Sequence, residues 1–210
     1  MTDWHDPAHR ITDADALRAL YGVPGETSLA KEADHVHPLY RPFIEAAPFV
    51  LLGTSGPGGL DVSPRGDPPG FVQVADDHTL LLPDRHGNNR ADSLYNLIAD
   101  PRVALLFMIP GCRETLRVNG HAFISTAPAL LQRCAMEGKL PRSVLVITVQ
   151  TMFFQCGRAL MRSSLWDPAA HVDRTTLPTP GQVLGTLSCG SIDGEAYDAA
   201  LPKRQRETLY

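Results

Sequence analysis

Short apolar runs, bounded by glycine, proline or polar residues, fill the middle of the chain. Such runs predict β-strands, because a strand needs few residues and ends at a turn. The run 115–125 alternates between apolar and polar residues over its first half, as a half-buried strand should. The strands predicted in this way are 49–54, 60–63, 70–74, 79–82, 103–109, 115–125 and 144–154.

Helical periodicity is limited to shorter segments around these strands. The sequence Thr12-Asp13-Ala14-Asp15 can cap a helix that stops before Gly22. Most consecutive strands are separated by turns instead of helices, so they should pair in hairpins. The pattern therefore predicts a mainly β protein with some α-helix (α+β), built as an antiparallel barrel with covering helices. The predicted helices are 12–20, 38–47, 91–99 and 127–138.

Three segments that differ in residue pattern and composition indicate the domain organisation. Residues 1–47 are helical in pattern, and we expect them to form an N-terminal extension packed on the barrel. Residues 48–166 carry the predicted strands and should form the barrel domain. Residues 167–210 begin with a stretch rich in proline and glycine, which predicts a C-terminal loop and tail of the same domain.

Composition and charge indicate a globular protein and argue against two classes of partner. Of the 210 residues, 43% are hydrophobic and 20% are charged, and no apolar run reaches the length of a transmembrane helix. The net charge of −4 argues against a general nucleic-acid-binding protein, which needs a basic surface. The chain starts with polar and acidic residues, unlike a signal peptide, so we expect a cytoplasmic protein.

Neither the cysteines nor the histidines form a recognisable metal motif. The four cysteines include no Cys-x-x-Cys pair, so we expect reduced thiols and neither a zinc site nor a redox pair. His35-x-His37 would place two rings on one strand face, but no neighbouring residue completes a set of metal ligands. We therefore expect no metal site. The cysteines are Cys112, Cys134, Cys156 and Cys189.

The segment from Pro83 to Arg90 is a candidate binding loop. Its sequence, Pro-Asp-Arg-His-Gly-Asn-Asn-Arg, connects a predicted strand to a predicted helix. A helix start offers unpaired N–H groups and the positive end of its dipole. Arg85 and Arg90 would add charged, forked donors, so the loop is suited to a phosphate. A solvated surface turn is the alternative interpretation.

Further polar residues could complete such a site. Asn88 and Asn89 carry amides that can bond phosphate or hydroxyl groups, and Ser93 lies one helical turn beyond the loop. In Ser63-Pro64-Arg65-Gly66 the arginine follows a strand end, where it could aim its fork at a phosphate. An exposed turn arginine is the alternative there.

A later segment, Arg162-Ser163-Ser164-Leu165-Trp166, brings an arginine and two serines close to a tryptophan. The indole could stack on a planar ring system. Tryptophans also anchor cores and interfaces, so that role is the alternative.

Taken together, these motifs resemble the pyridoxamine 5′-phosphate oxidase-like, FMN-binding split-barrel family over about residues 48–166. The most specific element is the spacing Asn89-Arg90-x-x-Ser93-x-x-Asn96-Leu97, which follows Ser63-Pro64-Arg65-Gly66 in the order typical of the family. The resemblance implies a six-stranded split barrel that forms a homodimer, with FMN in a cleft between the subunits.

The resemblance also implies roles for particular residues. Arg65 and Arg90 would contact the FMN phosphate, with Arg90 standing where many members have lysine. The other residues that it implies around the phosphate, the ribityl chain or the flavin edge are Ser63, Arg85, Asn88, Asn89 and Ser93. The segment with Arg162, Ser163 and Trp166 would approach the flavin, and the partner subunit could contribute it.

The activity that the resemblance implies is that of an FMN-dependent oxidoreductase, which transfers hydride between flavin N5 and a small substrate or NAD(P)H. The chain lacks the Trp-, Arg- and His-rich C-terminal segment of the vitamin B6 oxidase, which indicates another subgroup. We assign no catalytic acid or base. Two alternatives remain open: a flavin carrier without turnover, and a split-barrel protein that binds haem or a deazaflavin. His86, His121 and His171 would be the candidate haem ligands.

Overall fold

The computed structural model describes residues 4–210, and the chain divides into two compact units. The first unit ends at Glu32, and the second runs from Ala33 to Tyr210. Residues 1–3 of the predicted extension lie outside the described residues. How the first unit packs on the barrel stays a prediction.

The first unit contains short helices held by local caps. Asp13 Oδ1 accepts hydrogen bonds from the main-chain N–H groups of Asp15 and Ala16, so the predicted cap is confirmed. Gly22, with φ of 74°, adopts the left-handed conformation that ends the helix. No residue between 4 and 32 is buried, so this described part has no hydrophobic core of its own. Its elements are η1 (Pro7–His9), α1 (Ala14–Tyr21) and α2 (Glu26–Leu29).

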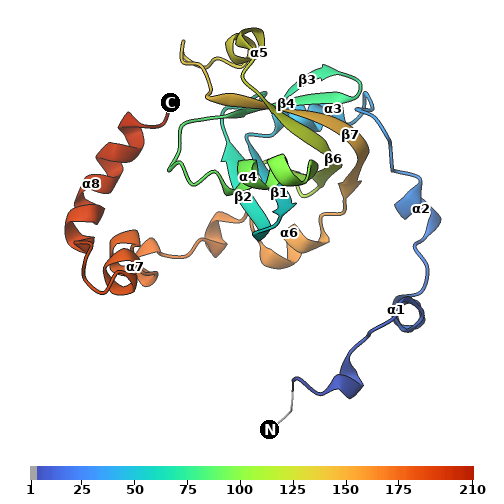
Figure 1. The fold of residues 1–210 in the computed structure, drawn as a ribbon. Coiled ribbons are helices and arrows are strands. Elements are labelled where there is room, and N and C mark those ends of the chain that lie inside the picture. The colour runs from blue at the N-terminus through green and yellow to red at the C-terminus, as the bar shows by residue number, and fades with distance from the viewer. Residues whose placement is uncertain (1–3) are drawn as a thin grey trace. The chain divides into compact units, whose positions relative to one another are not determined.

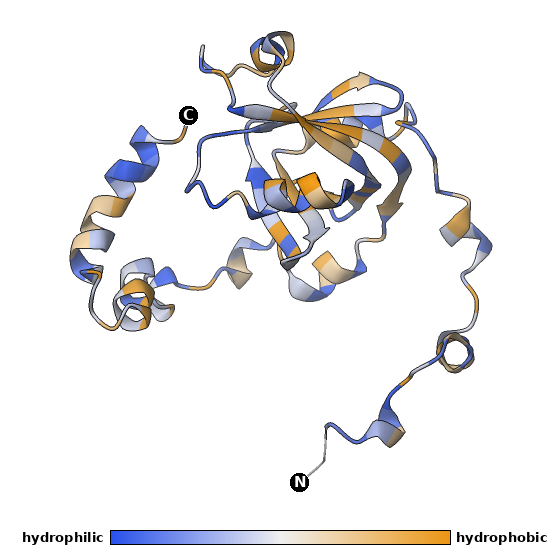
Figure 2. Ribbon diagram, in the orientation of Figure 1, coloured by the Kyte–Doolittle hydropathy of each residue, from blue (hydrophilic) through white to orange (hydrophobic). Residues whose placement is uncertain are grey.

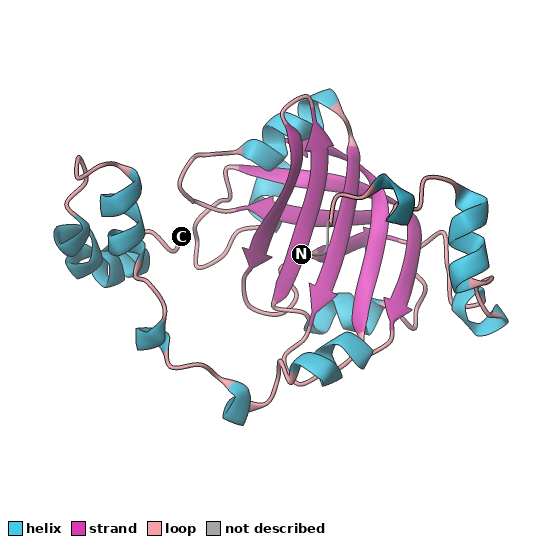
Figure 3. Ribbon diagram, turned by 90° about the horizontal axis from the view of Figure 1, so that it is seen from below, coloured by secondary structure: helices cyan, strands magenta, loops and turns pink. Residues whose placement is uncertain are grey.

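The second unit is built on one antiparallel sheet, which confirms the mainly β class (Figure 1). The strand order is β2-β1-β5-β6-β7-β4-β3, and Figure 3 shows the strands crossing as the sheet curls. The resemblance implied six strands, but the sheet has seven. The strands are β1 (Phe49–Gly56), β2 (Gly59–Gly66), β3 (Gln73–Asp76), β4 (Thr79–Asp84), β5 (Arg102–Met108), β6 (Thr115–Ser125) and β7 (Ser143–Gln155).

The core lies on the inner face of this sheet, where alternate residues of β5 and β6 are buried. Leu116, Val118 and Ala122 point inward from β6, and Phe107 packs into the same cluster. The strands of the sheet are largely orange in Figure 2, because apolar residues dominate them. The sequence periodicity over 115–125 is therefore realised with the bounds that it predicted.

Residues just before β1 belong to the sheet unit. Ala33 bridges Met152 of β7, and the N–H of Val36 donates to the carbonyl of Asp77 at 2.6 Å. Ile44 of α3 (Arg41–Ala46) and Ala47 are both fully buried in the core. Much of the predicted helix 38–47 thus belongs to the sheet unit and contributes to its core.

Shorter helices connect the later strands. Residues 127–138 form a helix only as far as Arg133, because the chain turns at Cys134 and Met136 then pairs with Lys139. The predicted helix 91–99 is realised as α4, which lies against β1 and β2 (Figure 1). The helices are α4 (Asp92–Ala99), α5 (Pro128–Arg133) and α6 (Arg158–Ser163).

Two helices occupy the region where the sequence indicated a loop and tail, α7 (Pro180–Leu187) and α8 (Gly194–Glu207). Thr179 and Gln182 form a capping box at the start of α7, with Pro180 at its first position. Gly181 of α7 and Gly194 of α8 lie where the two helices approach most closely. A Cβ at either position would overlap the backbone of the other, so this approach requires glycine at both. Two 3-10 turns precede them, η2 (Pro168–Ala170) and η3 (Arg174–Thr176). No helix between residues 4 and 210 is long and apolar enough to cross a bilayer.

Candidate functional site

A pocket of about 920 Å³ lies where β2, β4 and the loop before α4 come together. This loop is largely hydrophilic, in contrast to the strands beneath it (Figure 2). The volume is within the range of small-molecule and cofactor sites. The polar residues that line it are Asp61, Ser63, Arg65, Asp67, Asp84, Arg85, His86, Asn88, Asn89, Arg90, Asp92, Ser93, Arg142, Ser143 and Tyr210.

The pocket gathers seven of the ten residues that the sequence proposed for a cofactor site. They reach it from two separate segments of the chain: strand β2, and the loop after β4 together with the first turn of α4. The seven are Ser63, Arg65, Arg85, Asn88, Asn89, Arg90 and Ser93. Residues 86–90 of the loop are exposed and also line this pocket, so a binding role of the loop stays a prediction.

Strand alternation explains why β2 contributes three polar side chains to one wall. Asp61, Ser63 and Arg65 are the half-buried positions of β2, and every second side chain of a strand faces the same side. Ser93 Oγ donates to Asp61 Oδ2 at 2.5 Å and lies 3.0 Å from Ser63 Oγ. Arg65 Nε also donates to Ser63 Oγ, at 3.2 Å. The four side chains form one continuous hydrogen-bonded row.

Two of the arginines are held by partly buried carboxylates. Arg65 pairs with Asp84, which brings the ends of β2 and β4 together. Arg85 Nε donates to Asp67 Oδ2 at 2.7 Å, and its Nη1 donates to the carbonyl of Cys134 at 2.8 Å. These contacts fix the direction of each guanidinium before any ligand binds, which is the arrangement that favours directed recognition.

The loop itself has an unusual backbone. Asn88 Oδ1 accepts a hydrogen bond from the N–H of Arg90 at 3.0 Å, which forms an Asx turn. Asn89 and Ala91 have φ of 63° and 54°, in the left-handed region that non-glycine residues rarely adopt. Asp92 opens α4 and pairs with the exposed Arg90. The positive end of the helix dipole favours a negative charge at the start of α4. The Asp92 carboxylate supplies part of the negative charge that a bound anion would otherwise provide there.

Arg142 is a pocket residue that the sequence analysis missed. Its Nη1 donates to Asn89 Oδ1 at 2.5 Å, and its N–H donates to the carbonyl of Asp84 at 3.0 Å. Within residues 4–210 no carboxylate forms an ion pair with Arg142, so its charge is available to a ligand. The residue stands directly before β7 and reaches the pocket because Ser143 pairs with Asp84.

The remaining three predicted residues lie elsewhere in this chain. Trp166 Nε1 donates to the carbonyl of Cys112 at 2.7 Å, and Ser163 Oγ donates to the carbonyl of Leu160 at 3.2 Å. Arg162 is exposed in the last turn of α6. None of the three is among the described residues that line the pocket, so their contact with a cofactor stays a prediction.

The pocket balances four arginines against four aspartates. An anion in it would therefore be recognised by aimed N–H donors more than by a net positive field. The aspartates also offer acceptors, which suit a ligand with hydroxyl groups. The arginines are Arg65, Arg85, Arg90 and Arg142, and the aspartates are Asp61, Asp67, Asp84 and Asp92.

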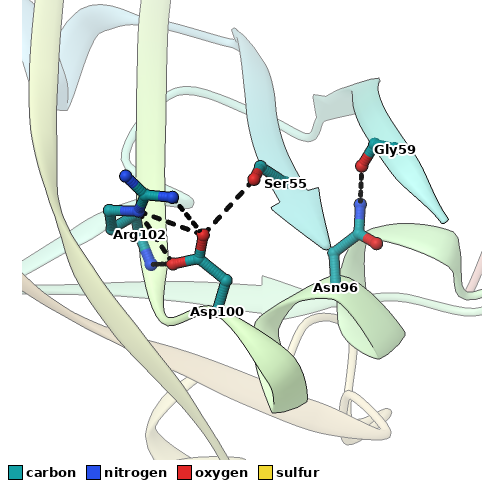
Figure 4. Close-up of polar contacts among 5 residues, drawn as sticks. All are labelled: Ser55, Gly59, Asn96, Asp100 and Arg102. Atoms are coloured by element: carbon teal, nitrogen blue, oxygen red, sulfur yellow. Dashed lines mark hydrogen bonds and ion pairs between the residues drawn. The ribbon is translucent and has the colours of Figure 1, made fainter. Parts of the chain in front are cut away.

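Two polar side chains, one in α4 and one directly after it, anchor the later part of the helix (Figure 4). The buried Asn96 donates from Nδ2 to Thr54 Oγ1 at 3.2 Å and to the carbonyl of Gly59 at 3.5 Å. Asp100, just after the helix, accepts from Arg102 and from Ser55 Oγ. The motif residue Asn96 thus ties α4 to the β1–β2 hairpin.

The cluster of Asp100, Arg102 and Ser55 predicts a pH-dependent stability. The hydrogen bonds from Arg102 hold the pKa of the Asp100 carboxyl well below its usual range. Because the folded-state pKa is depressed, the stabilisation is present above the ordinary pKa, near about 3.9, and is lost as the pH falls towards the folded-state pKa. We expect Asp100→Asn to destabilise the fold at pH 7 and to matter progressively less below pH ~4.

Urea unfolding at several pH values checks this expectation. Asp77→Asn, at an exposed carboxylate of the β3–β4 turn, controls for the change of net charge. A difference between wild type and Asp100→Asn that stays constant with pH would contradict the role of the carboxylate.

Comparison with known proteins identifies the family. Residues 36–156, more than half of the chain, match the family model described as pyridoxamine 5′-phosphate oxidase. The chain belongs to this family, and the sequence-based interpretation is confirmed. No curated protein matches the sequence.

Several solved structures resemble the sheet unit. HupZ of Group A Streptococcus is 16% identical, with a TM-score of 0.48, over 58% of this chain and 94% of that one. A putative pyridoxamine 5′-phosphate oxidase of Lactobacillus delbrueckii is 16% identical, with a TM-score of 0.46, over 58% of this chain and 95% of that one. A protein named F420 reductase is 22% identical, with a TM-score of 0.40, over 57% of this chain and 98% of that one.

Proposed function

We propose that this chain is an FMN-dependent oxidoreductase that works as a homodimer. The observation that carries the proposal is the convergence of Ser63, Arg65, Asn89, Arg90 and Ser93 on one pocket, in a chain of the pyridoxamine 5′-phosphate oxidase family. Ser63 and Arg65 come from β2 and the other three from the loop before α4 and its first turn, so the two groups meet only in the folded chain.

The chemistry of the pocket fits the phosphate and the ribityl chain of FMN. Arg90 and Arg142 are exposed arginines at its rim and can give forked donors to a phosphate. Asp61 and Asp84 are half-buried acceptors that suit the hydroxyl groups of a ribityl chain. A strongly positive pocket would suit a bare phosphate better than this balanced set does.

Each group has a defined task in the proposal. Bound FMN supplies hydride chemistry at flavin N5, which the side chains cannot provide. Arg65 and Arg90 hold the phosphate, with Arg142 as a third donor. The row from Arg65 through Ser63 and Ser93 to Asp61 keeps the wall of the pocket rigid, because each member has a hydrogen-bonded neighbour.

A homodimer would bring the remaining candidates to the cofactor. Arg162, Ser163 and Trp166 lie outside the pocket of their own chain, so we assign them to the pocket of a second copy. Light scattering of the purified protein tests this assignment, since a monomer would remove the shared site.

An absorbance spectrum of the purified protein, with identification of any retained cofactor, tests the proposal directly. We expect bound FMN, or saturable quenching of flavin fluorescence when FMN is added to the protein. A colourless protein that does not bind FMN would contradict the proposal. Reduction of the bound flavin by NADH or NADPH would separate an oxidoreductase from a flavin carrier.

Replacing Arg142 with alanine is expected to weaken FMN binding roughly tenfold, because one charge-assisted hydrogen bond contributes about 1.5 kcal/mol. Fluorescence titration measures the dissociation constants. Arg41→Ala is the matched control, since Arg41 is an exposed arginine of α3 that pairs with Glu45 instead of lining the pocket. Equal losses in the two variants would mean that general charge, and not contact, causes the effect.

A further inference from the structure

Part of the pocket wall comes from the residues that follow α8. Leu209 and Tyr210 line the pocket beside Asp67 and Arg85. The hydroxyl of Tyr210 donates to Asp67 Oδ1 at 2.6 Å, and the Arg85 guanidinium lies 5.9 Å from the centre of the tyrosine ring. That distance is within the range of a cation–π contact. A tyrosine that is 143 residues away from Asp67 in sequence thus fills part of the proposed cofactor pocket.

Asp67 makes this contact chemically demanding. Its side chain is only 1% exposed, and its two oxygens are shared between Arg85 and Tyr210. If Tyr210 moved away, Asp67 Oδ1 would lose this donor, and water or the donor group of a ligand would have to replace it. The hydrogen bond to Asp67 raises the pKa of Tyr210, as expected for a phenol that donates to a carboxylate. Asp67 Oδ1 therefore favours a ligand that carries a hydrogen-bond donor.

The segment 208–210, which we call the arm, is held by few contacts. Besides the two contacts of the Tyr210 side chain, Lys139 Nζ donates to the main-chain oxygen of Tyr210 at 3.1 Å. Thr208 donates from its N–H and its hydroxyl to the carbonyl of Arg204, which ties the start of the arm to α8 only. Leu209 is 63% exposed. A segment with so little burial opens at a small free-energy cost, so a competing ligand can replace it.

We propose that Asp67 and Arg85 form a subsite for a planar aromatic ring with a hydrogen-bond donor at its edge, and that Tyr210 is a tethered occupant which the ligand displaces. The ring would lie over Arg85, and its donor would meet Asp67 Oδ1. A flavin ring and an aromatic substrate both have this chemistry. The inference rests on the proposed function for the identity of the pocket, but its first test needs no flavin.

The first test uses p-cresol, which is the side chain of tyrosine as a free molecule. Tyr210→Ala is expected to bind p-cresol about tenfold or more tightly than wild type, because the tethered ring no longer competes. Saturation-transfer NMR titration measures both affinities. Toluene, which lacks the donor, should show no such gain. Tyr95→Ala removes an exposed tyrosine of α4 and serves as the matched control.

Tyr210→Phe separates the contribution of the aromatic ring, which lies near Arg85, from that of the hydroxyl, which donates to Asp67. It keeps the ring but removes the hydroxyl, so its affinity for p-cresol should fall between those of wild type and Tyr210→Ala. If Tyr210→Ala binds p-cresol no better than wild type, or binds toluene equally well, the subsite assignment is wrong.

Titrating FMN against the p-cresol complex of Tyr210→Ala shows whether the subsite holds the flavin ring or the ring of an aromatic substrate. Displacement of p-cresol by FMN assigns the subsite to the flavin, and simultaneous binding assigns it to an aromatic substrate. If p-cresol binds as expected but no variant binds FMN, the proposed function fails and the subsite stands. If FMN binds but removal of Tyr210 brings no gain for p-cresol, the subsite fails and the proposed function stands.

Discussion

Replacing Arg65 and Arg90 together with alanine is expected to weaken FMN binding by about 3–6 kcal/mol, or roughly 10²–10⁴-fold. Each guanidinium would supply a charge-assisted contact to the phosphate, and such contacts contribute about 1.5–3 kcal/mol. The two side chains line the same pocket from β2 and from the loop before α4. Quenching of flavin fluorescence at a fixed salt concentration gives the dissociation constants. An unchanged affinity in a folded double variant would refute the phosphate assignment.

The ion pair between Arg65 and Asp84 calls for one further variant. The Asp84 side chain is 15% exposed, so removing Arg65 uncovers a carboxylate that would both destabilise the fold and repel a phosphate. Adding Asp84→Asn to the double variant removes this charge. If direct contact carries the affinity, the triple variant binds FMN as weakly as the double variant. Recovery of most of the affinity would show that the uncovered carboxylate caused the loss.

The sequence predicted best what depends on neighbouring residues. The strand 115–125 was found with its observed bounds, because its inward face alternates within one segment. The cap at Asp13 was also local. Helices α7 and α8 were missed because proline and glycine dominated that region, although Thr179 and Gln182 carry a capping-box pattern that could have marked the start of α7.

The candidate site was predicted only in part, for a physical reason. Its motif residues share a local pattern around the loop before α4, which the sequence contains directly. Arg142 enters the pocket only through the register of β7 against β4, and Tyr210 only through the path of the chain after α8. The pairing of Arg65 with Asp84 likewise depends on where two strands end. Such contacts between distant segments leave no signal in a single sequence.

Gly120→Ala is expected to have the largest effect on stability, a loss on the order of 3 kcal/mol. Gly120 lies at the register shift between β6 and β7, and a Cβ there would overlap the main-chain oxygen of Thr148. The added methyl group cannot be relieved by a rotamer change, because the atom it meets belongs to the backbone of the central strand pair. Urea unfolding followed by circular dichroism measures the loss of unfolding free energy.

Gly58→Ala is the matched control, because the same substitution at that turn would meet no atom within 4 Å and needs no left-handed backbone. It should change the stability by less than ~1 kcal/mol. A comparable loss in both variants would mean that backbone flexibility, and not the close approach of β7, explains Gly120. The pocket depends on the same strand pair, since β7 carries Ser143 to the end of β4. Any fraction of Gly120→Ala that remains folded should still bind FMN if the distortion stays at the register shift, whereas weaker binding by that fraction would show that β7 transmits the distortion to Arg142.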